Sequence, residues 1–517
     1  MKNPADRPSE AELRRRLAAG SQDAEDYGDL AARLTEAERT DEAIAIWELA
    51  LALPLSEVGR AAVEVDLGWT LYYQTCQVDR ALALARQSLA RVAGASEAPE
   101  VLYVRGLAHS LIGDWLSGTD HEAAANAWRT ALSTLDRLFR EHPEWEAFEY
   151  LWLDAAGLHN ALNDGAGAVA LCRRHLQAHL SLPARVGALA TLGEALRLTG
   201  RLAEAEEAVV EALACVGEQR GMRPHLCHLR GLICRAGGRP TDARESFERA
   251  LAALDGHPLQ NDARIVKTIR GNLAEVYTEL GEHDKAAAAW RELLGWYADD
   301  DPARAWVLLS LGHAGYSAGA LADARSAYEA VLAAPHASDE DRADAAIWAL
   351  WTAGEFHYRA GEYAPATRAF ESLLDHYRDD DPDRRKVLRW LGDCCYFLGD
   401  FAGARERYEE VLASPRVSDA ERADFRDLAD RSVARFLYDA GQYAEAADAF
   451  KRVLDRLSDD HPEWCGWLPW LGACYFQVGA YGAARDCYEE VLRAPQATEA
   501  EKTNARRGLD ALRRDAG

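Results

Sequence analysis

The stretch WLGDCCYFLGDFAGARERYEEVL, residues Trp390–Leu412, decides the fold. Apolar residues recur every three or four positions on either side of Gly399 and Asp400, which predicts two short amphipathic helices joined by a turn. Gly392 and Ala404 are expected to face each other where the helices cross, so that the backbones approach and the larger side chains interlock. Neither helix can bury its apolar stripe alone, so the pair must pack against further pairs.

The turn glycine of this stretch recurs at nearly regular intervals over more than half of the chain. The recurring glycines are Gly200, Gly238, Gly281, Gly319, Gly361, Gly399, Gly441 and Gly479. Each is followed five residues later by an alanine, from Ala205 to Ala484. This regularity indicates a tandem repeat of one helix-turn-helix unit.

The order of residues within the unit resembles the tetratricopeptide repeat. The matching residues are Leu391, Gly392, Tyr396, Gly399, Ala404, Tyr408 and Val411. The resemblance implies an all-α fold, a right-handed superhelical solenoid in which each repeat contacts only its neighbours.

A longer period lies over the short one. Successive turn glycines are 38, 43, 38, 42, 38, 42 and 38 residues apart, so the repeats come in pairs with a period close to 80 residues. Three helix-start signatures keep this interval: Ser338 with Asp341, Ser418 with Glu421 and Thr498 with Glu501. We therefore expect about twelve repeats arranged in units of two.

The repeats differ in clarity along the chain, which suggests four segments. Residues 1–26 are expected to form a leader with one short helix, and residues 27–181 to hold four degenerate repeats. Residues 182–497 hold the regular repeats. Residues 498–517 are expected to form a final helix that caps the apolar end of the stack.

Pro469 falls inside the first helix of the last regular repeat. Proline lacks a backbone N–H, so it kinks a helix or delays its start. The sequence therefore leaves open whether Trp464 and Trp467 lie on a helix or on extended chain.

Composition narrows the class of protein. Of the 517 residues 49% are hydrophobic, which is enough for a continuous buried core. The 85 acidic and 59 basic residues give a net charge of -26, which disfavours nucleic acid as a partner. No apolar run approaches the roughly 18 residues that span a bilayer, and the N-terminal sequence lacks the apolar segment of a secretion signal. We expect a cytoplasmic protein without a membrane partner, its ten cysteines reduced and packed as small apolar side chains.

No catalytic site is predicted. The chain has no GxxxxGK[S/T], no GxGxxG after a strand pattern and no HExxH, and no part of it is rich in β-forming residues. Two clusters have the density of metal ligands: Cys172 with His175 and His179, and His225 with Cys227 and His228. A closed zinc site needs four ligands, and neither cluster offers a fourth, so we predict no metal and no cofactor.

The first helix of each repeat is expected to line the inner wall of the solenoid, and in the C-terminal half this wall combines aromatic and basic residues. The predicted partner-binding residues are Trp306, Tyr316, Trp348, Trp351, Tyr358, Lys386, Arg389, Trp390, Tyr396, Arg431, Arg435, Tyr438 and Trp470. Tryptophan, tyrosine and arginine dominate many binding interfaces. The tyrosines have an alternative role, because each can pack against the next repeat instead. Corresponding positions in earlier repeats, such as Thr191, Glu194 and Arg197, carry no aromatic residue.

These patterns favour a non-enzymatic scaffold or adaptor that holds a partner protein or peptide segment, with aromatic and acidic residues, in the C-terminal groove. The alternative is a regulator that changes its curvature on binding a small peptide or metabolite. If the groove binds the partner, replacing both Arg389 and Arg431 by glutamate is expected to abolish capture and leave the melting temperature nearly unchanged. The sequence does not indicate the oligomeric state.

Overall fold

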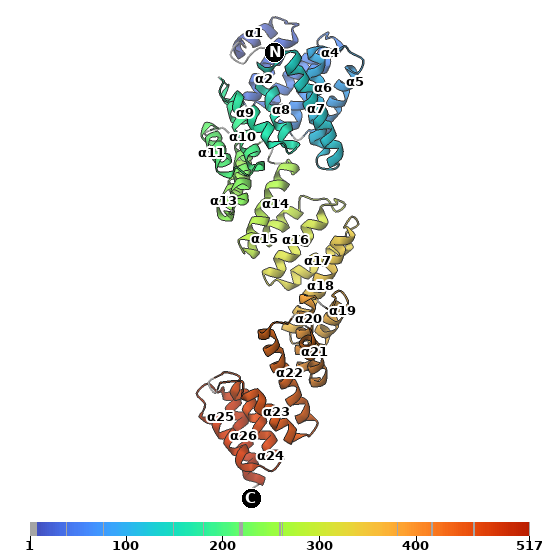
Figure 1. Cartoon of the computed structure of the whole chain (residues 1–517). Helices are drawn as coiled ribbons and strands as arrows, with labels where there is room; N and C mark the ends of the chain where they lie inside the picture. The colour runs from blue at the N-terminus through green and yellow to red at the C-terminus, as the bar shows by residue number, and fades with distance from the viewer. Residues whose placement is uncertain are drawn as a thin grey trace. The chain divides into compact units, whose positions relative to one another are not determined.

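The computed structural model describes residues 8–37, 39–75, 77–147, 149–178, 180–216, 221–257, 260, 262–379, 381–414, 417–458 and 461–515. Within these ranges the regular structure consists of 26 α-helices and one short 3-10 helix, with no strand (Figure 1). The predicted all-α class is therefore confirmed. The chain divides into two units, Met1–Trp296 and Tyr297–Gly517, which are called unit 1 and unit 2.

Unit 1 runs from blue to green in Figure 1. Its helices are α1 (Glu10–Ala18), α2 (Ala24–Glu36), α3 (Thr40–Leu51), α4 (Glu57–Gln74), α5 (Val78–Arg91), α6 (Pro99–Leu116), α7 (His121–Glu141), η2 (Pro143–Ala147), α8 (Glu149–Ala161), α9 (Gly165–His175), α10 (Leu182–Leu198), α11 (Leu202–Val216), α12 (Arg223–Ala236), α13 (Pro240–Leu254), α14 (Ala263–Glu279) and α15 (His283–Leu294).

Unit 2 runs from yellow to red. Its helices are α16 (Arg304–Ser317), α17 (Leu321–Ala333), α18 (Asp339–Arg359), α19 (Tyr363–Leu374), α20 (Pro382–Leu398), α21 (Phe401–Ala413), α22 (Asp419–Asp439), α23 (Tyr443–Leu454), α24 (Trp464–Gln477), α25 (Tyr481–Arg493) and α26 (Glu499–Asp515).

The helices form twelve consecutive pairs, from α2 with α3 to α24 with α25, as the repeat count predicted. Within each unit the two helices of a pair pack together, and the second helix also packs on the first helix of the next pair. This continuous stacking defines an all-α solenoid. Two helices lie outside the pairs: α1 packs on α2 and buries Leu13, whereas α26 packs on α24 and α25 and buries Leu512.

The turn glycines take the backbone conformation that the pattern predicted. All eight have a positive φ, between 69° at Gly238 and 81° at Gly399. A left-handed residue that ends a helix is strained for any side chain with a Cβ atom, so glycine is favoured at each turn.

The two helices of a pair cross where an aromatic ring covers a second glycine. A Cβ atom added to Gly392 would lie 2.4 Å from Cε1 of Tyr408. The atoms nearest to the glycine belong to the ring of Tyr408, one turn further along α21 than Ala404, so this ring fills the space above Gly392. Other pairs show the same contact, among them Gly231 with Phe247, Gly312 with Tyr328, Gly354 with Phe370 and Gly472 with Tyr488.

The predicted helix starts are present in unit 2. Ser338 and Ser418 each form a capping box at the start of α18 and α22, with Asp341 and Glu421 as the partners. Thr498 does the same before α26, because Glu501 accepts from the Thr498 N–H at 2.7 Å and its own N–H donates to the Thr498 hydroxyl at 3.3 Å.

Replacing Ser418 with alanine is expected to lower the free energy of unfolding of unit 2 by about 1 kcal/mol, because it removes the acceptor for the Glu421 N–H. Chemical denaturation of the full chain measures this loss. Ser414→Ala is the control, because no hydrogen bond of the Ser414 hydroxyl is found among the described residues. Equal stability of the two variants would show that the cap contributes nothing.

Helix α24 is continuous through Pro469, so Trp464 and Trp467 both lie on the helix. Trp464 is buried and the Trp467 ring packs 6.1 Å from Phe450, so both side chains pack against the rest of unit 2. None of the helices in the described ranges combines the length and the apolar character needed to cross a membrane.

Candidate functional site

All of the predicted partner-binding residues lie on the first helices of the pairs of unit 2, which are α16, α18, α20, α22 and α24. The structure places most of them in contact with residues of neighbouring helices. The contacts fall into three kinds: stacked aromatic rings, ion pairs, and an arginine held between rings.

Tryptophans of the first helices stack on aromatic rings of the preceding second helices. The three stacked pairs are Trp348 on Tyr328 (6.3 Å between centroids), Trp390 on Phe370 (5.8 Å) and Trp470 on Phe450 (6.5 Å). Trp390 and Trp470 are one 80-residue period apart, as are Phe370 and Phe450. These rings join successive pairs, and their burial contributes to stability.

The tyrosines support the packing alternative. The Tyr316 hydroxyl donates to Oε2 of Glu355 at 2.7 Å, and the rings of Tyr358 and Tyr438 lie edge-on against Trp390 and Trp470. Each of these contacts joins neighbouring first helices.

Two further predicted residues, Trp351 and Tyr396, also pack against other residues of unit 2. Nε1 of Trp351 donates to the hydroxyl of Tyr377 at 2.9 Å, and the Trp351 ring packs 5.9 Å from Phe370. The Tyr396 ring contacts Phe401 at 5.1 Å across the turn. The Trp351 and Tyr396 rings are only partly exposed. Most of each ring packs against neighbouring helices, and only the remainder forms part of the surface.

The basic residues of the wall are largely neutralised. Arg389 pairs with Asp424 at 2.8 Å, and Lys386 pairs with Asp383 at 2.7 Å. Arg431 lies between Asp427 and Glu463, at 2.6 Å from each, and its side chain is only 17% exposed.

These ion pairs change the expectation for the charge reversal of Arg389 and Arg431. A glutamate at 431 would face Asp427 and Glu463 in a partly buried site, so the double variant is expected to lose stability. Loss of binding by that variant would therefore not distinguish a damaged groove from a damaged fold.

Arg435 differs from the other cations. Its guanidinium carbon lies 3.9 Å from the centroid of the Trp470 ring and 4.8 Å from that of Phe401. No ion pair of Arg435 is found among the described residues, and its Nε has no hydrogen-bond partner there. Two aromatic rings therefore fix a partly buried guanidinium that also interacts with the Tyr396 hydroxyl and has no ion-pair partner among the described residues.

Phe397 is a surface residue that the sequence analysis missed. It is 54% exposed, although its ring stacks on Tyr363 at 4.7 Å with only 14° between the planes. It follows Tyr396 and lies two residues before the turn glycine Gly399, outside the apolar stripe. A phenylalanine off the apolar stripe, in the last turn of an amphipathic helix, is the signal that could have identified it.

We call Phe397, Tyr363, Tyr396, Phe401 and Arg435 the ladder surface, because contacts between successive members join them. Phe397 contacts Tyr363 and Tyr396, Tyr396 contacts Phe401, and Arg435 covers Phe401. These five residues come from α19, α20, α21 and α22, so the folded stack brings them together.

The sequence also contains a match to the GxSxG pattern of serine hydrolases, at residues 315–319, which the search for catalytic motifs did not find. In hydrolases this pattern places the serine on a turn between a strand and a helix, whereas Ser317 is the last residue of α16. His313 lies one turn before it, but its Nδ1 contacts the Tyr328 hydroxyl at 3.0 Å and its Nε2 lies 3.5 Å from Asp344. Both imidazole nitrogens are engaged, so His313 has no free nitrogen to activate Ser317.

In unit 1 three aspartates on successive first helices accept hydrogen bonds from neutral side chains. Asp66 on α4 accepts from the Tyr103 hydroxyl, and Asp114 on α6 accepts from the Tyr73 hydroxyl. Asp154 on α8 accepts from Ser110 at 3.0 Å. We call Asp66, Asp114 and Asp154 the acid cluster.

Desolvation dominates the electrostatics of the acid cluster. Burial raises the pKa of Asp66 and of Asp154 to about 7, and it also raises the pKa of Asp114. Asp114 raises the pKa of Asp154 further by repulsion between the two charges. No ion pair to these carboxylates is found among the described residues.

Asp154→Asn is expected to stabilise unit 1 at about pH 8 and to have little effect near pH 4. Between the normal pKa of an aspartate, about 4, and the raised value of about 7, the folded state binds more protons than the unfolded state, so the wild type loses stability as pH rises. Denaturation curves from pH 4 to 8 measure the difference. Glu207→Gln, at an exposed position of α11, is the control. A difference that does not vary with pH would contradict the raised pKa.

Of the first possible metal cluster of the sequence, the structure describes two of the three members. Cys172 is buried and His175 stacks on Trp152 at 4.2 Å, whereas His179 lies outside the described residues. No group of three or more His, Cys, Asp or Glu side chains in these ranges has the geometry to hold a metal ion.

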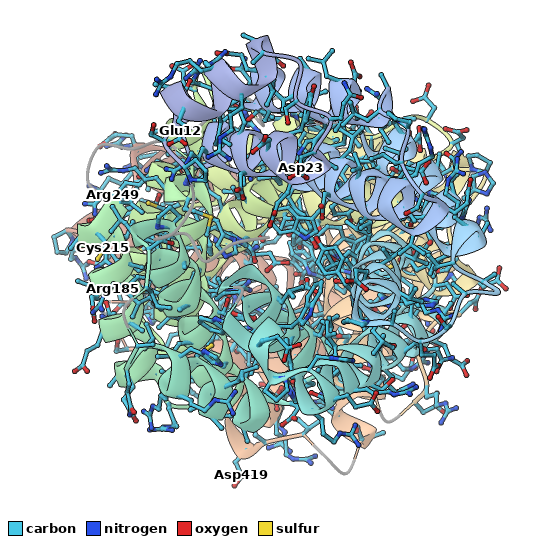
Figure 2. All side chains as sticks on the ribbon, turned by 90° about the horizontal axis from the view of Figure 1, so that it is seen from above. Glu12, Asp23, Arg185, Cys215, Arg249 and Asp419 are labelled. Atoms are coloured by element: carbon cyan, nitrogen blue, oxygen red, sulfur yellow. The ribbon has the colours of Figure 1, made fainter. Side chains whose placement is uncertain are left out.

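The described cysteines are free thiols, and most are buried. Cys215 is one of those only partly buried, and Figure 2 labels it along the same edge of the view as Arg185 and Arg249. Cys172 has a pKa of about 12 because burial disfavours the thiolate, so it packs as an apolar side chain.

The chain is an all-α helical repeat protein. Its helices come in pairs, a glycine with positive φ forms the turn of each regular pair, and an aromatic ring covers a glycine where the two helices of several pairs cross. Residues 352–419 and 396–462 match the family described as Tetratricopeptide repeat. The chain is therefore a tetratricopeptide-like helical repeat protein. No curated protein matches it.

Similar solved structures include two bacterial repeat proteins and one human protein. The C-terminal part of a TPR repeat-containing protein from Cytophaga hutchinsonii has 14% identity and a TM-score of 0.38, and the match covers 53% of this chain and 98% of that chain. A tetratricopeptide repeat protein from Parabacteroides merdae has 21% identity and a TM-score of 0.31, with 52% and 92% covered. The human IFIT1 dimer with m7Gppp-AAAA has 17% identity and a TM-score of 0.42, with 75% and 80% covered.

Proposed function

We propose that the protein is a non-enzymatic interaction scaffold that holds a peptide segment of a partner protein on the ladder surface of unit 2. Tetratricopeptide-like repeats generally bind proteins. The observation that carries the proposal is Phe397, a large apolar side chain that is 54% exposed and yet held in one orientation by Tyr363. A rigid, exposed aromatic residue beside a cation has the composition of a binding hot spot.

The chemistry of the ladder surface suggests its ligand. Phe397 offers a ring face and edge to an aromatic or aliphatic side chain, and Arg435 offers guanidinium donors to a carboxylate. Arg389 is 48% exposed and bound to the equally exposed Asp424, so an incoming carboxylate can compete for it. The expected ligand is a segment that carries aromatic and acidic residues.

The predicted tryptophans outside the ladder surface contribute to binding through their positions on the first helices. Trp390 and Trp470 fix the spacing of the pairs, and Trp306 is 42% exposed at the start of unit 2. We propose that these side chains extend the binding surface beyond the ladder.

Selection of peptides from a displayed library against the immobilised full chain tests the proposal. We expect enrichment of sequences with an aromatic and an acidic residue a few positions apart, and we expect a Phe397→Ser chain to retain few of them. Failure to enrich any sequence, or equal retention by the Phe397→Ser chain, would contradict the proposed site.

A further inference from the structure

Unit 2 has a second surface that the proposed function does not use, a groove along α18. Helices α17 and α19 form its two edges and α18 forms its floor, around a volume of about 540 Å³. The floor residues are Ala346, Ala349, Leu350, Ala353 and His357. They recur every three or four positions, so they follow one side of α18 and the groove runs along that helix. We call it the α18 groove.

The floor of the α18 groove is largely apolar and made mostly of small side chains. Alanine leaves room for another backbone to approach, and the distance between packed helices depends on the side chains at the contact. Leu332, on the α17 edge, is 40% exposed and adds a large apolar side chain. From Ala346 to His357 the floor extends over about 16 Å at the rise of an α-helix, which is three turns. The groove therefore has the length and the surface of a site for a short helix.

The 80-residue period supplies a second groove for comparison. Helices α21, α22 and α23 begin and end 80 residues after α17, α18 and α19, and we call the corresponding surface the sister groove. The edges on α17 and α21 are identical, since Arg325, Glu329 and Leu332 correspond to Arg405, Glu409 and Leu412. The floors differ, since Arg426 and Asp430 stand in the sister groove where the α18 groove has Ala346 and Leu350. The apolar floor is therefore particular to one groove and is not required by the repeat.

In the sister groove the polar floor is satisfied without a ligand. Asp430 pairs with Arg456 at 2.5 Å, and Arg426 is exposed to solvent. At the same positions of α18, Leu350 and Ala346 are only partly buried, so apolar side chains face solvent there. A contiguous apolar surface left open on a folded protein is typical of an interaction site.

The α19 edge of the groove differs in charge from its counterpart. Arg368 is exposed, and no ion pair of its side chain is found among the described residues, whereas the sister groove has Asp448 at this position. On the α17 edge, Arg325 pairs with Glu329 of its own helix, and both side chains are about half exposed. An unpaired cation beside an apolar floor complements a ligand with an apolar stripe and an acidic edge.

We propose that the α18 groove binds an amphipathic α-helix of a partner protein, about three turns long, with its apolar stripe on the floor and a carboxylate at Arg368. Apolar residues at positions i, i+3 or i+4, and i+7 of such a helix match the spacing of the floor. The ladder residue Tyr363 lies five residues before Arg368 on α19, which places the two side chains about 140° apart around the helix. The proposal is therefore independent of the ladder surface.

Selection from a displayed library of helical peptides, with one face randomised, tests the groove on the immobilised full chain. We expect enrichment of sequences with an apolar stripe at helical spacing and an aspartate or glutamate at its edge. The enriched peptides are expected to bind about tenfold or more weakly to Ala346→Arg and to Arg368→Asp. Each of these changes introduces the residue that the sister groove already has, so the repeat accommodates it.

Arg405→Asp is the matched control, because it makes the same change of charge on the edge of the sister groove. We expect it to leave the affinity unchanged, and the melting temperature of each variant shows that it is folded. Equal losses from Arg368→Asp and Arg405→Asp would overturn the proposal, as would a selection without any helical sequence that Ala346→Arg weakens. Sedimentation of the chain alone tests a different occupant: a dimer that Ala346→Arg dissociates would assign the groove to a second copy and also overturn the proposal.

Discussion

Gly392→Val is expected to destabilise unit 2 by about 3 kcal/mol, the upper part of the usual range for overpacked cores. A Cβ atom at this position would lie 2.4 Å from Cε1 of Tyr408, where no real contact is tolerated. The ring cannot easily move away, because Tyr408 is 1% exposed and its hydroxyl donates to Asp393 at 2.6 Å. Denaturation of the full chain, followed by tryptophan fluorescence, measures the loss.

Gly482→Ala is the matched control for this replacement. Gly482 lies in α25 of the same unit, and an added Cβ would have no atom within 4 Å. Alanine is favoured over glycine in a helix by about 1 kcal/mol, so this variant is expected to be as stable as the wild type or slightly more stable. Removing the obstructing ring with Tyr408→Ala should make the effect of Gly392→Val much smaller. Additive losses in the double variant would show that the two residues do not meet.

Phe397→Ser is expected to weaken binding of a peptide selected on the wild-type chain by about tenfold or more, the effect of losing a hot-spot aromatic residue. Phe397 is already 54% exposed, so the fold loses little with it. The matched control is Phe436→Ser, which removes a phenylalanine that is 42% exposed on α22 and has no ring contact among the described residues. An equal loss in both variants would indicate a general effect of surface apolarity. Fluorescence anisotropy of the labelled peptide gives both affinities.

Arg435 can be tested in the same way. Arg435→Met removes the charge but keeps an unbranched side chain that packs well on the rings of Trp470 and Phe401. We expect weaker binding of peptides that carry an acidic residue and no change for peptides in which that residue is replaced by its amide. Arg485→Met, at an exposed position of α25, is the control.

The repeat architecture was predictable because it depends on local residues that recur. The turn glycines, the capping serines and the alternation of long and short spacings each specify a backbone feature near them in sequence. The ring over Gly392 was not predicted, because a helical pattern shows which residues share a face and does not show which side chain reaches furthest over the partner helix.

The candidate site was predictable only in part, for a related reason. The pattern placed aromatic and basic residues on the first helices, but whether a side chain is free depends on partners from other helices, such as Asp424 for Arg389 or Phe370 for Trp390. Phe397 was missed because it lies outside the apolar stripe. The contact of Arg264 with Tyr72 joins residues 192 positions apart, and no local pattern reports such a contact.

The most direct test of the proposed function is photo-crosslinking with p-benzoylphenylalanine in place of Phe397 or, separately, of Phe436. Both positions are exposed on first helices of unit 2, so the two proteins differ mainly in which surface carries the reactive group. Crosslinking of the selected peptide from position 397 and not from position 436 is the result that we predict. Crosslinking from position 436 alone, or equally from both, would contradict a binding site on the ladder surface.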